Sequence, residues 1–264
     1  MNCTCNSCGK SFDADPEQTA PMHRLLCGDS TSLDDVLRLM DGKKAVMCAT
    51  DPPYLVDYTG ADRPGGAGKD WSEHYHEVDI KDATGFFRLV FANVLEVLAP
   101  NAAIYCWHAH KRVVDIVLVW RELGILDHQQ IIWVKPCATF GRVFWHFRHE
   151  PCMMGWRKGS MPAHDGDQST DSIWEIDWEG KARVVGNLHP TEKPAEIFAR
   201  PMRKHTMPGD VCFEPFSGSG SNLAAAEKEG RICYALELEP AFVAVALERL
   251  TGMGLEPKLL EEAT

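Results

Sequence analysis

The sequence of 264 residues has no apolar stretch that approaches the length of a membrane-spanning helix. Its start, Met1-Asn2-Cys3, lacks the basic segment and apolar run of a signal peptide. It also lacks an excess of positive charge, because 27 Lys and Arg against 38 Asp and Glu give a formal net charge of −11. Such a chain can bind nucleic acid only through a local basic patch on an acidic body. The sequence therefore predicts a soluble, cytoplasmic protein with no membrane partner.

A disulfide framework is missing as well, since the ten cysteines are scattered through the chain, which fits a reducing compartment. Three of them form a C-x-C-x-x-C pattern near the start: Cys3, Cys5 and Cys8. This is half of a zinc-knuckle pattern, and His23 or Cys27 is the nearest candidate for a fourth ligand. A terminus with reduced thiols fits equally well. We treat residues 1–22 as an N-terminal appendage in which a structural zinc remains an open alternative.

The remaining chain is long enough to bury one full core. Strand-like and helix-like periods alternate along it: residues 82–98 carry apolar side chains at helical spacing, and residues 102–107 form an apolar run. This alternation predicts an α/β fold with a mostly parallel sheet. We expect one domain over residues 23–252, followed by a tail at 253–264.

The sharpest motif is an abrupt corner at Asp51-Pro52-Pro53-Tyr54, directly after an apolar run at 45–49. Two prolines can continue neither a sheet ladder nor a helix interior, so the chain must leave the predicted strand here. The corner then presents a carboxylate, backbone carbonyls and an aromatic ring. Such groups can hold an exocyclic amino group and stack on the ring that carries it. Alone, the motif could equally be a stiff turn.

A second motif joins a predicted strand at 210–213, a glycine-rich turn and a helix at 222–229, in the order of a nucleotide-binding βα unit. No Gly-Lys-Ser/Thr follows at P-loop spacing, and Leu223 replaces the third glycine of a dinucleotide fingerprint. Glu214 would repel a pyrophosphate but suits the ammonium of S-adenosylmethionine (AdoMet), and Glu237 is placed for a ribose. The pattern favours AdoMet, with these candidate ligands: Glu214, Phe216, Ser217, Gly218, Ser219, Gly220, Asn222 and Glu237.

Residues 188–194 predict the start of a helix, with Thr191 as N-cap and Pro194 in the first turn. The free N–H groups of a helix start attract an anion, and Lys193 adds a full positive charge. The segment is thus a candidate site for a carboxylate.

Basic and aromatic residues gather between residues 135 and 158, where five Lys or Arg stand against a single acid, Glu150. Cations for phosphates and aromatic rings for unstacked bases are typical of nucleic-acid binding. A solvated edge over core aromatics would give the same pattern. We expect DNA contacts from this segment and from the helix start before it: Lys111, Arg112, Arg142, Trp145, Arg148, Arg157 and Lys158.

Four spaced motifs together resemble the β-group of AdoMet-dependent DNA amino-methyltransferases, which methylate adenine N6 or cytosine N4. They are Cys27-Gly28-Asp29, Asp51-Pro52-Pro53-Tyr54, His189-Pro190-Thr191-Glu192-Lys193-Pro194 and Phe216-Ser217-Gly218-Ser219-Gly220. As in that group, the catalytic motif precedes the cofactor motif, and the resemblance spans about residues 23–250. It implies a circularly permuted, Rossmann-like methyltransferase fold, with a doubly wound sheet and helices on both faces.

The resemblance also implies roles for single residues. Asp51 and the Pro52 carbonyl would accept the N–H groups of a flipped base, and Tyr54 would stack on that base. On the cofactor side, Asp29 would face the adenine and Glu237 the ribose. The remaining implied contacts are Thr191 and Lys193 with the cofactor carboxylate, 216–220 as a backbone cradle, and 143–155 with the flipped base.

The chain departs from fuller members of the group, because no long target-recognition domain separates residue 158 from His189. We expect DNA recognition to fall to residues 55–80, 142–149 and 159–187. The expected partner is double-stranded DNA in a bacterial or phage-infected cell, and a homodimer, common in the group, stays open. Adenine N6 is the expected target, because the group more often pairs Asp with adenine. Alternatives are cytosine N4, an RNA or protein-amide methyltransferase, and an inactive DNA-binding regulator.

Overall fold

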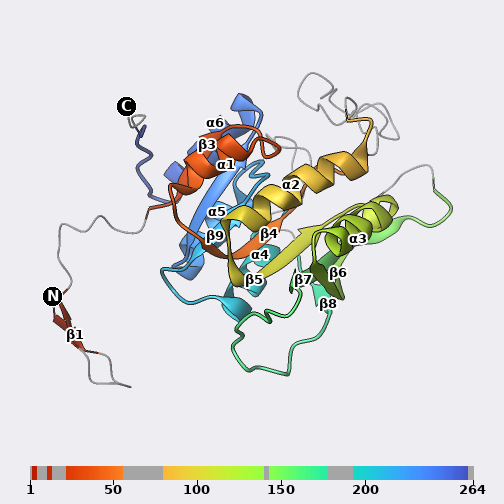
Figure 1. Ribbon diagram of the computed structural model, residues 1–264, viewed down its shortest axis with the longest axis horizontal. Helices are drawn as coiled ribbons and strands as arrows, with labels where there is room; N and C mark the ends of the chain where they lie inside the picture. Colours follow the sequence, from red (N-terminus) through yellow and green to blue (C-terminus); the bar gives the residue numbers. More distant parts are fainter. Residues whose placement is uncertain are drawn as a thin grey trace.

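The computed structural model describes residues 22–55, 80–139, 143–177 and 193–260, together with two short paired strands, β1 (Asn2–Thr4) and β2 (Ser11–Asp13). The main part is built around one eight-stranded sheet, with the strand order β3-β10-β9-β4-β5-β7-β6-β8. Only β7 runs antiparallel to its neighbours, β5 and β6, within the described residues (Figure 1). The predicted α/β fold with a mostly parallel sheet is confirmed.

The strands of this sheet are β3 (Arg24–Cys27), β4 (Ala45–Thr50), β5 (Leu98–Trp107), β6 (Ile125–Thr139), β7 (Phe147–Arg157), β8 (Ile173–Glu175), β9 (Val211–Glu214) and β10 (Ile232–Glu237). The helices are α1 (Leu33–Met40), α2 (Ala83–Val97), η2 (His110–Arg112), α3 (Val113–Glu122), α4 (Glu196–His205), α5 (Ser221–Glu229) and α6 (Pro240–Gly252).

Helices cover both faces of the sheet, as the resemblance implies (Figure 1). The alternation of side chains along β4 divides the apolar core in two: Cys48 packs with α1, α2 and α3, whereas Met47 and Ala49 pack with α4, α5 and Leu250 of α6. Both layers are fully buried at their centres, since Phe87 and Ile197 are at most 1% exposed. The sheet is therefore held rigidly, and its edge can position side chains accurately.

The two halves of the sheet diverge from its centre. From β4 the chain proceeds to β5 on one side, and from β9 it proceeds to β10 on the other, so β4 and β9 are neighbours at a topological switch point. In open α/β sheets, ligands bind outside the carboxyl ends of strands at such a point. The corner after β4 and the turn after β9 both emerge there.

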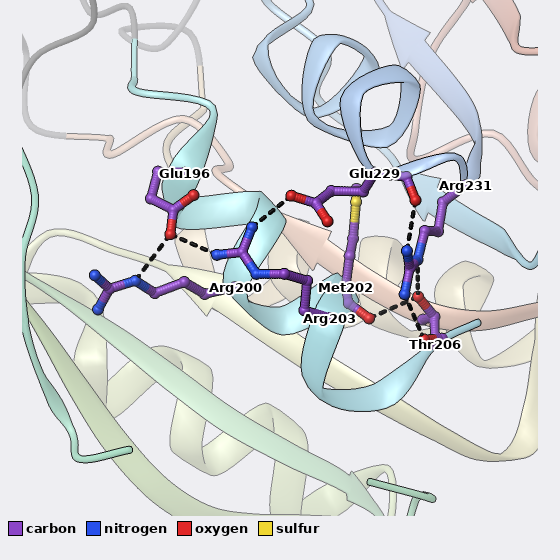
Figure 2. A network of polar contacts seen from close by, with 7 residues as sticks. All are labelled: Glu196, Arg200, Met202, Arg203, Thr206, Glu229 and Arg231. Atoms are coloured by element: carbon purple, nitrogen blue, oxygen red, sulfur yellow. Dashed lines mark hydrogen bonds and ion pairs between the residues drawn. The ribbon is translucent and has the colours of Figure 1, made fainter. Parts of the chain in front are cut away.

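A polar network fixes α4, the helix that follows Lys193, against α5 and the start of β10 (Figure 2). Glu196 accepts hydrogen bonds from Arg200 (3.1 Å) and Arg203 (2.5 Å), and Arg203 also pairs with Glu229. Arg231 donates to the hydroxyl and the carbonyl of Thr206 at 3.0 and 2.7 Å. Half-exposed ion pairs contribute up to about 1 kcal/mol each. Apolar packing therefore provides most of the energy that holds α4 on the sheet, and the polar network helps to orient the helix.

The start of α4 differs from the expectation. The helix begins at Glu196 with Ala195 as its N-cap and without a side-chain cap. The predicted N-cap role of Thr191 is therefore wrong, and Thr191 itself lies outside the described residues. Lys193 belongs to an irregular segment before the helix. Across the described ranges, no helix has both the length and the apolar character needed to cross a membrane.

Candidate active site

The corner after β4 and the turn after β9 lie side by side, as predicted. Cys48 is in register with Phe213, and two buried hydrogen bonds join the strand ends. Thr50 Oγ1 donates to Glu214 at 2.7 Å, and Asn222 Nδ2 donates to the Ala49 carbonyl at 2.6 Å. Residues separated by more than 160 positions in the chain therefore form a single edge.

At the corner, Asp51 meets a compact cluster of charges. Its Oδ2 lies 2.5 Å from Lys193 Nζ, which also lies 3.3 Å from Glu150 Oε2. On the other side of Glu150, Oε1 lies 3.1 Å from Lys135 Nζ. The Tyr54 hydroxyl donates to Glu150 Oε2 at 2.8 Å. Two carboxylates and two ammonium groups thus balance around one phenol.

Within this cluster the lysine side chains are more deeply buried than the carboxylate side chains. The side chains of Lys193 and Lys135 are only 7% and 5% exposed, whereas those of Asp51 and Glu150 are each 18% exposed. The ammonium groups therefore lie beneath the carboxylates. Lys193 also lies 4.9 Å from the centre of the Tyr54 ring, a cation–π contact that helps fix the ring.

The two carboxylate oxygens of Asp51 differ in their hydrogen bonding. Oδ2 is bound by Lys193, while Oδ1 is buried and has no hydrogen-bond partner among the described residues. Burial raises the pKa of Asp51, the Lys193 ammonium opposes that rise, and the Glu150 carboxylate adds to it. Burial also raises the pKa of the Tyr54 phenol, and the two neighbouring carboxylates raise it further. A buried acceptor without a partner is energetically costly unless a donor arrives, so Oδ1 is suited to receive an N–H group.

The glycine-rich turn is shaped by its own backbone. Gly218 and Gly220 both have positive φ angles, +51° and +78°, which other residues adopt only at a cost. A Cβ at Gly220 would lie 3.0 Å from the Cβ of Ala246 on α6. The turn closes through the Ser217 N–H, which donates to the Leu236 carbonyl at 2.7 Å. Gly220 is thus required both for the turn and for the packing of α6.

Two further carboxylates stand at the same edge. The Glu237 carboxylate accepts the Gly218 N–H at 2.7 Å and the Glu239 N–H at 2.9 Å, and burial raises its pKa. Asp29 follows β3, which pairs with β10, and its Oδ1 accepts both donors of Thr31 at 2.8 Å. Because Glu237 occupies the Gly218 N–H that a phosphate would use, the turn fits an adenosine without phosphates, as in AdoMet.

Two of the predicted cofactor ligands are deeply buried. Glu214 and Asn222 are 1% and 2% exposed, and they bind each other at 3.0 Å. Burial raises the pKa of Glu214 to about 8, so its carboxyl group is mostly neutral at pH 7. The cofactor roles of Glu214 and Asn222 therefore stay predictions, since both side chains bind within the protein, to Thr50, to each other and to the Ala49 carbonyl. Both side chains tie β4 to the turn from beneath.

The predicted DNA contacts separate into two groups, because β7 is antiparallel. Arg157 ends β7 and Lys158 follows it, beside the start of β5 and at the edge opposite Asp51. Arg157 donates to the Leu95 carbonyl at 3.1 Å. Arg157 and Lys158 therefore lie away from the Asp51 corner, and their contact with DNA stays a prediction. Arg112 also supports the protein itself, because it binds the Leu55 carbonyl directly after the corner.

The other group lies at the active edge, on the hairpin of β6 and β7. Trp145 is 88% exposed and Phe144 is fully exposed. Arg148 is exposed although its Nε binds the Lys135 carbonyl at 3.1 Å, and Lys111 is exposed on η2. Arg142 lies outside the described residues. Among the described residues, the basic surface beside the site is smaller than the sequence pattern indicates.

Sequence reasoning missed the role of two residues. The resemblance placed Glu150 in the segment 143–155 beside the flipped base, and Lys135 was counted among the basic residues of 135–158. Neither the resemblance nor the residue pattern indicated that both side chains join the Asp51 cluster. Their positions on adjacent strands near the same hairpin depend on strand register, which the residue pattern does not reveal. The available signal was the position of the two charges next to apolar runs: Lys135 follows the run 131–134, and Glu150 precedes the run 151–156.

The N-terminal zinc pattern cannot be followed, since Cys3, Cys5 and Cys8 lie outside the residues with described side chains. His23, one of the two candidates for a fourth ligand, has both ring nitrogens in contact with the protein. Its Nδ1 accepts the Cys233 N–H at 3.0 Å, and its Nε2 lies 3.0 Å from Glu227. No group of three potential metal ligands occurs in the described part of the chain.

The sheet order and the paired loops at its switch point agree with the fold of solved DNA methyltransferases, on which the chain superposes. Residues 46–248 match the family described as DNA methylase, of the N6 and N4 type, and the chain belongs to that family. The chain is thus a DNA amino-methyltransferase.

Relatives and solved structures agree with this assignment. Type II methyltransferase M2.DpnII from Streptococcus pneumoniae is 26% identical over 227 residues, covering 77% of this chain and 81% of the relative. Type II methyltransferase M.HinfI from Haemophilus influenzae is 21% identical over 262 residues, covering 91% and 71%. The M1.HpyAVI–SAM complex superposes with a TM-score of 0.65 at 17% identity, covering 87% of this chain and 99% of that chain. The PvuII DNA methyltransferase, which is cytosine-N4-specific, gives 0.63 at 17% identity, covering 90% and 88%.

Proposed function

We propose that this DNA amino-methyltransferase methylates adenine N6 in double-stranded DNA at the Asp51–Tyr54 corner. The observation that carries the proposal is the state of Asp51: Lys193 holds Oδ2, whereas Oδ1 is buried and has no hydrogen-bond partner among the described residues. The choice of adenine rests on the Asp at the first position of the motif. Cytosine N4 is the second candidate, because the fold also serves an N4-specific enzyme.

Asp51 acts on the nucleophile. The lone pair of an aromatic amine is delocalised into its ring, and acceptance of the two N–H groups by Asp51 and the Pro52 carbonyl localises it on nitrogen. AdoMet, when bound, supplies the electrophilic methyl group. With AdoMet bound, the nitrogen would bond to the methyl carbon as the carbon–sulfur bond breaks with its electron pair on sulfur. The proton lost from the nitrogen would pass to the buried Oδ1 of Asp51, and from there to solvent. No covalent intermediate with the protein is needed.

Positioning provides most of the rate enhancement in such a transfer, since alignment of two reactants can contribute about 7–11 kcal/mol. Tyr54 stacks on the target base, its ring oriented by Glu150 and Lys193. Extrusion of the base from the duplex costs a few kcal/mol. Stacking and hydrogen bonds at the corner offset that cost.

The cofactor side uses the carboxylates and the turn at the switch point. Asp29 contacts the adenine of AdoMet, Glu237 the ribose, and Gly218 and Gly220 let the backbone approach closely. Support comes from the shared edge of β3, β10 and β9. The Lys193 ammonium is paired with Asp51 and Glu150. A contact with the cofactor carboxylate therefore requires this ammonium to bind the cofactor and these two carboxylates at the same time.

DNA contacts come from the hairpin of β6 and β7 and from η2. Phe144 and Trp145 offer stacking surfaces at the tip of the hairpin, and Lys111 and Arg148 offer charge for phosphates. These residues stand at the same edge as Asp51, which supports their role.

The test is methyl transfer from labelled AdoMet to duplex DNA, followed by mass spectrometry of the digested nucleosides. We expect N6-methyladenine, and N4-methylcytosine would transfer the assignment to the second candidate. The Asp51→Ala variant should lose transfer by at least about 1000-fold, because the nitrogen is neither polarised nor aligned. Its AdoMet affinity by calorimetry should stay within about threefold of the wild type. Label incorporated preferentially into transcripts would contradict DNA as the substrate.

A further inference from the structure

Glu150 contacts both Tyr54 of the corner and the Lys193 ammonium that holds Asp51. It lies on β7, where it is opposite Trp133 of β6. Its Oε2 accepts the Tyr54 hydroxyl at 2.8 Å and lies 3.3 Å from Lys193, while its Oε1 lies 3.1 Å from Lys135. A carboxylate can accept at several lone pairs at once, so one side chain fixes a ring and two cations.

The charge state of Glu150 suits this task. Burial would raise its pKa, but the ammonium groups of Lys193 and Lys135 and the Tyr54 hydroxyl lower it to about 2. Glu150 is therefore a permanent anion at neutral pH. Because it shares Lys193 with Asp51, that ammonium cannot move fully onto Asp51, where it would compete with the target amine.

We propose that Glu150 is a positioning residue of this enzyme: it fixes the Tyr54 ring and shares the Lys193 ammonium, so that Asp51 presents Oδ1 to the target amino group. The role rests on the proposed function. It assigns no contact between Glu150 and substrate, since Glu150 acts through Tyr54 and Lys193. Sequence order hides this relation, because the three residues come from β7, from the corner after β4 and from the segment before α4.

The decisive variant is Glu150→Gln, which keeps an acceptor for the Tyr54 hydroxyl but removes the charge. Lys193 then binds Asp51 alone and weakens it as an acceptor. We expect kcat on duplex DNA to fall about 10-fold or more, while KM for DNA and Kd for AdoMet change by less than about threefold.

The pH dependence of kcat provides a second measurement, because a purely structural role of Glu150 would not shift it. Glu150 raises the pKa of Asp51, so its removal lowers that pKa, and the acid limb of the kcat profile should move to lower pH. The titratable groups around Asp51 are Lys193, Tyr54, Glu150, Lys135, Glu214 and the thiols of Cys106 and Cys152.

A second variant separates positioning from charge balance. Glu150→Gln alone leaves two buried ammonium groups for one carboxylate, which destabilises the fold. The double variant Glu150→Gln with Lys135→Met restores the balance. We expect its thermal stability to return toward the wild type while kcat and the acid limb keep the values of the single variant.

Asp127→Asn is the matched control. The Asp127 side chain is 19% exposed and pairs with Arg121 at 2.7 Å, at the opposite end of β6, so kcat should stay within about twofold of the wild type. A Glu150→Gln enzyme with wild-type kcat and acid limb would overturn the positioning role and leave the proposed function in place. Recovery of kcat together with stability in the double variant would reduce Glu150 to charge balance. A wild-type enzyme that transfers no methyl group to DNA would instead overturn the proposed function itself.

Discussion

At the scale of single residues, Gly220 joins the cofactor turn to the fold. Its φ of +78° and the 3.0 Å that would separate an added Cβ from Ala246 both oppose any side chain. We expect Gly220→Ala to lose about 2 kcal/mol in urea unfolding, since the left-handed backbone costs about 1–2 kcal/mol, and to weaken AdoMet binding. Gly166→Ala is the matched control, because Gly166 has the same φ with open space around it. Equal losses in both variants would remove the packing argument.

Glu214 gives the chain a pH dependence of its own. The pKa of about 8 in the folded state exceeds the ordinary value of 4.5 because of burial, so the folded state binds more protons than the unfolded state between these values. The stabilising contribution of Glu214 is present below pH 4.5 and is lost as pH rises through 8. Glu214→Gln should therefore show a smaller decrease in unfolding free energy between about pH 5 and 8 than the wild type. Urea unfolding of both proteins at each pH measures this difference. An equal decrease in unfolding free energy in the variant and the wild type would contradict a buried, neutral Glu214.

At the scale of elements, the hairpin of β6 and β7 serves two purposes. Its strands carry Lys135 and Glu150 inward to the corner, and its tip carries Phe144 and Trp145 outward. Removal of these exposed rings should leave stability unchanged. Because stacking of a base on an aromatic ring contributes about 1–3 kcal/mol, the double alanine variant should raise KM for DNA by about 10-fold or more.

The control for the hairpin is an apolar pair with similar chemistry elsewhere. Val114 and Leu118 on α3 are 62% and 56% exposed, and their double alanine variant should bind DNA like the wild type. An equal change in KM in both variants would show that general surface hydrophobicity, rather than the hairpin, accounts for the effect.

At the scale of the whole molecule, the elements that the sequence predicts are those fixed by local chemistry. The corner of Asp51, the turn at Gly218 and the helix over 82–98 depend on prolines, glycines and apolar spacing within a few residues. The inward turn of Glu150 and the remote place of Arg157 depend instead on β7 entering the sheet antiparallel between β5 and β6. That register is a property of long-range pairing, so composition alone could not place Arg157 at the edge opposite Asp51. The bond between Glu214 and Thr50 also joins distant parts of the chain, so the local pattern did not indicate it.

The position of the exposed cations at one edge of the sheet predicts where this acidic protein binds DNA. With a net charge of −11, the chain can attract phosphates where cations stand together, and at the active edge the described residues include Lys111 and Arg148. Each neutralised phosphate contributes about −0.9 to the slope of log K against log salt. Lys111→Ala and Arg148→Ala should each reduce that slope by about 1, measured by fluorescence anisotropy of labelled duplex DNA. Lys158→Ala, at the opposite edge, should leave the slope unchanged, and a reduction there as large as at Lys111 would mean that DNA wraps around both edges of the sheet.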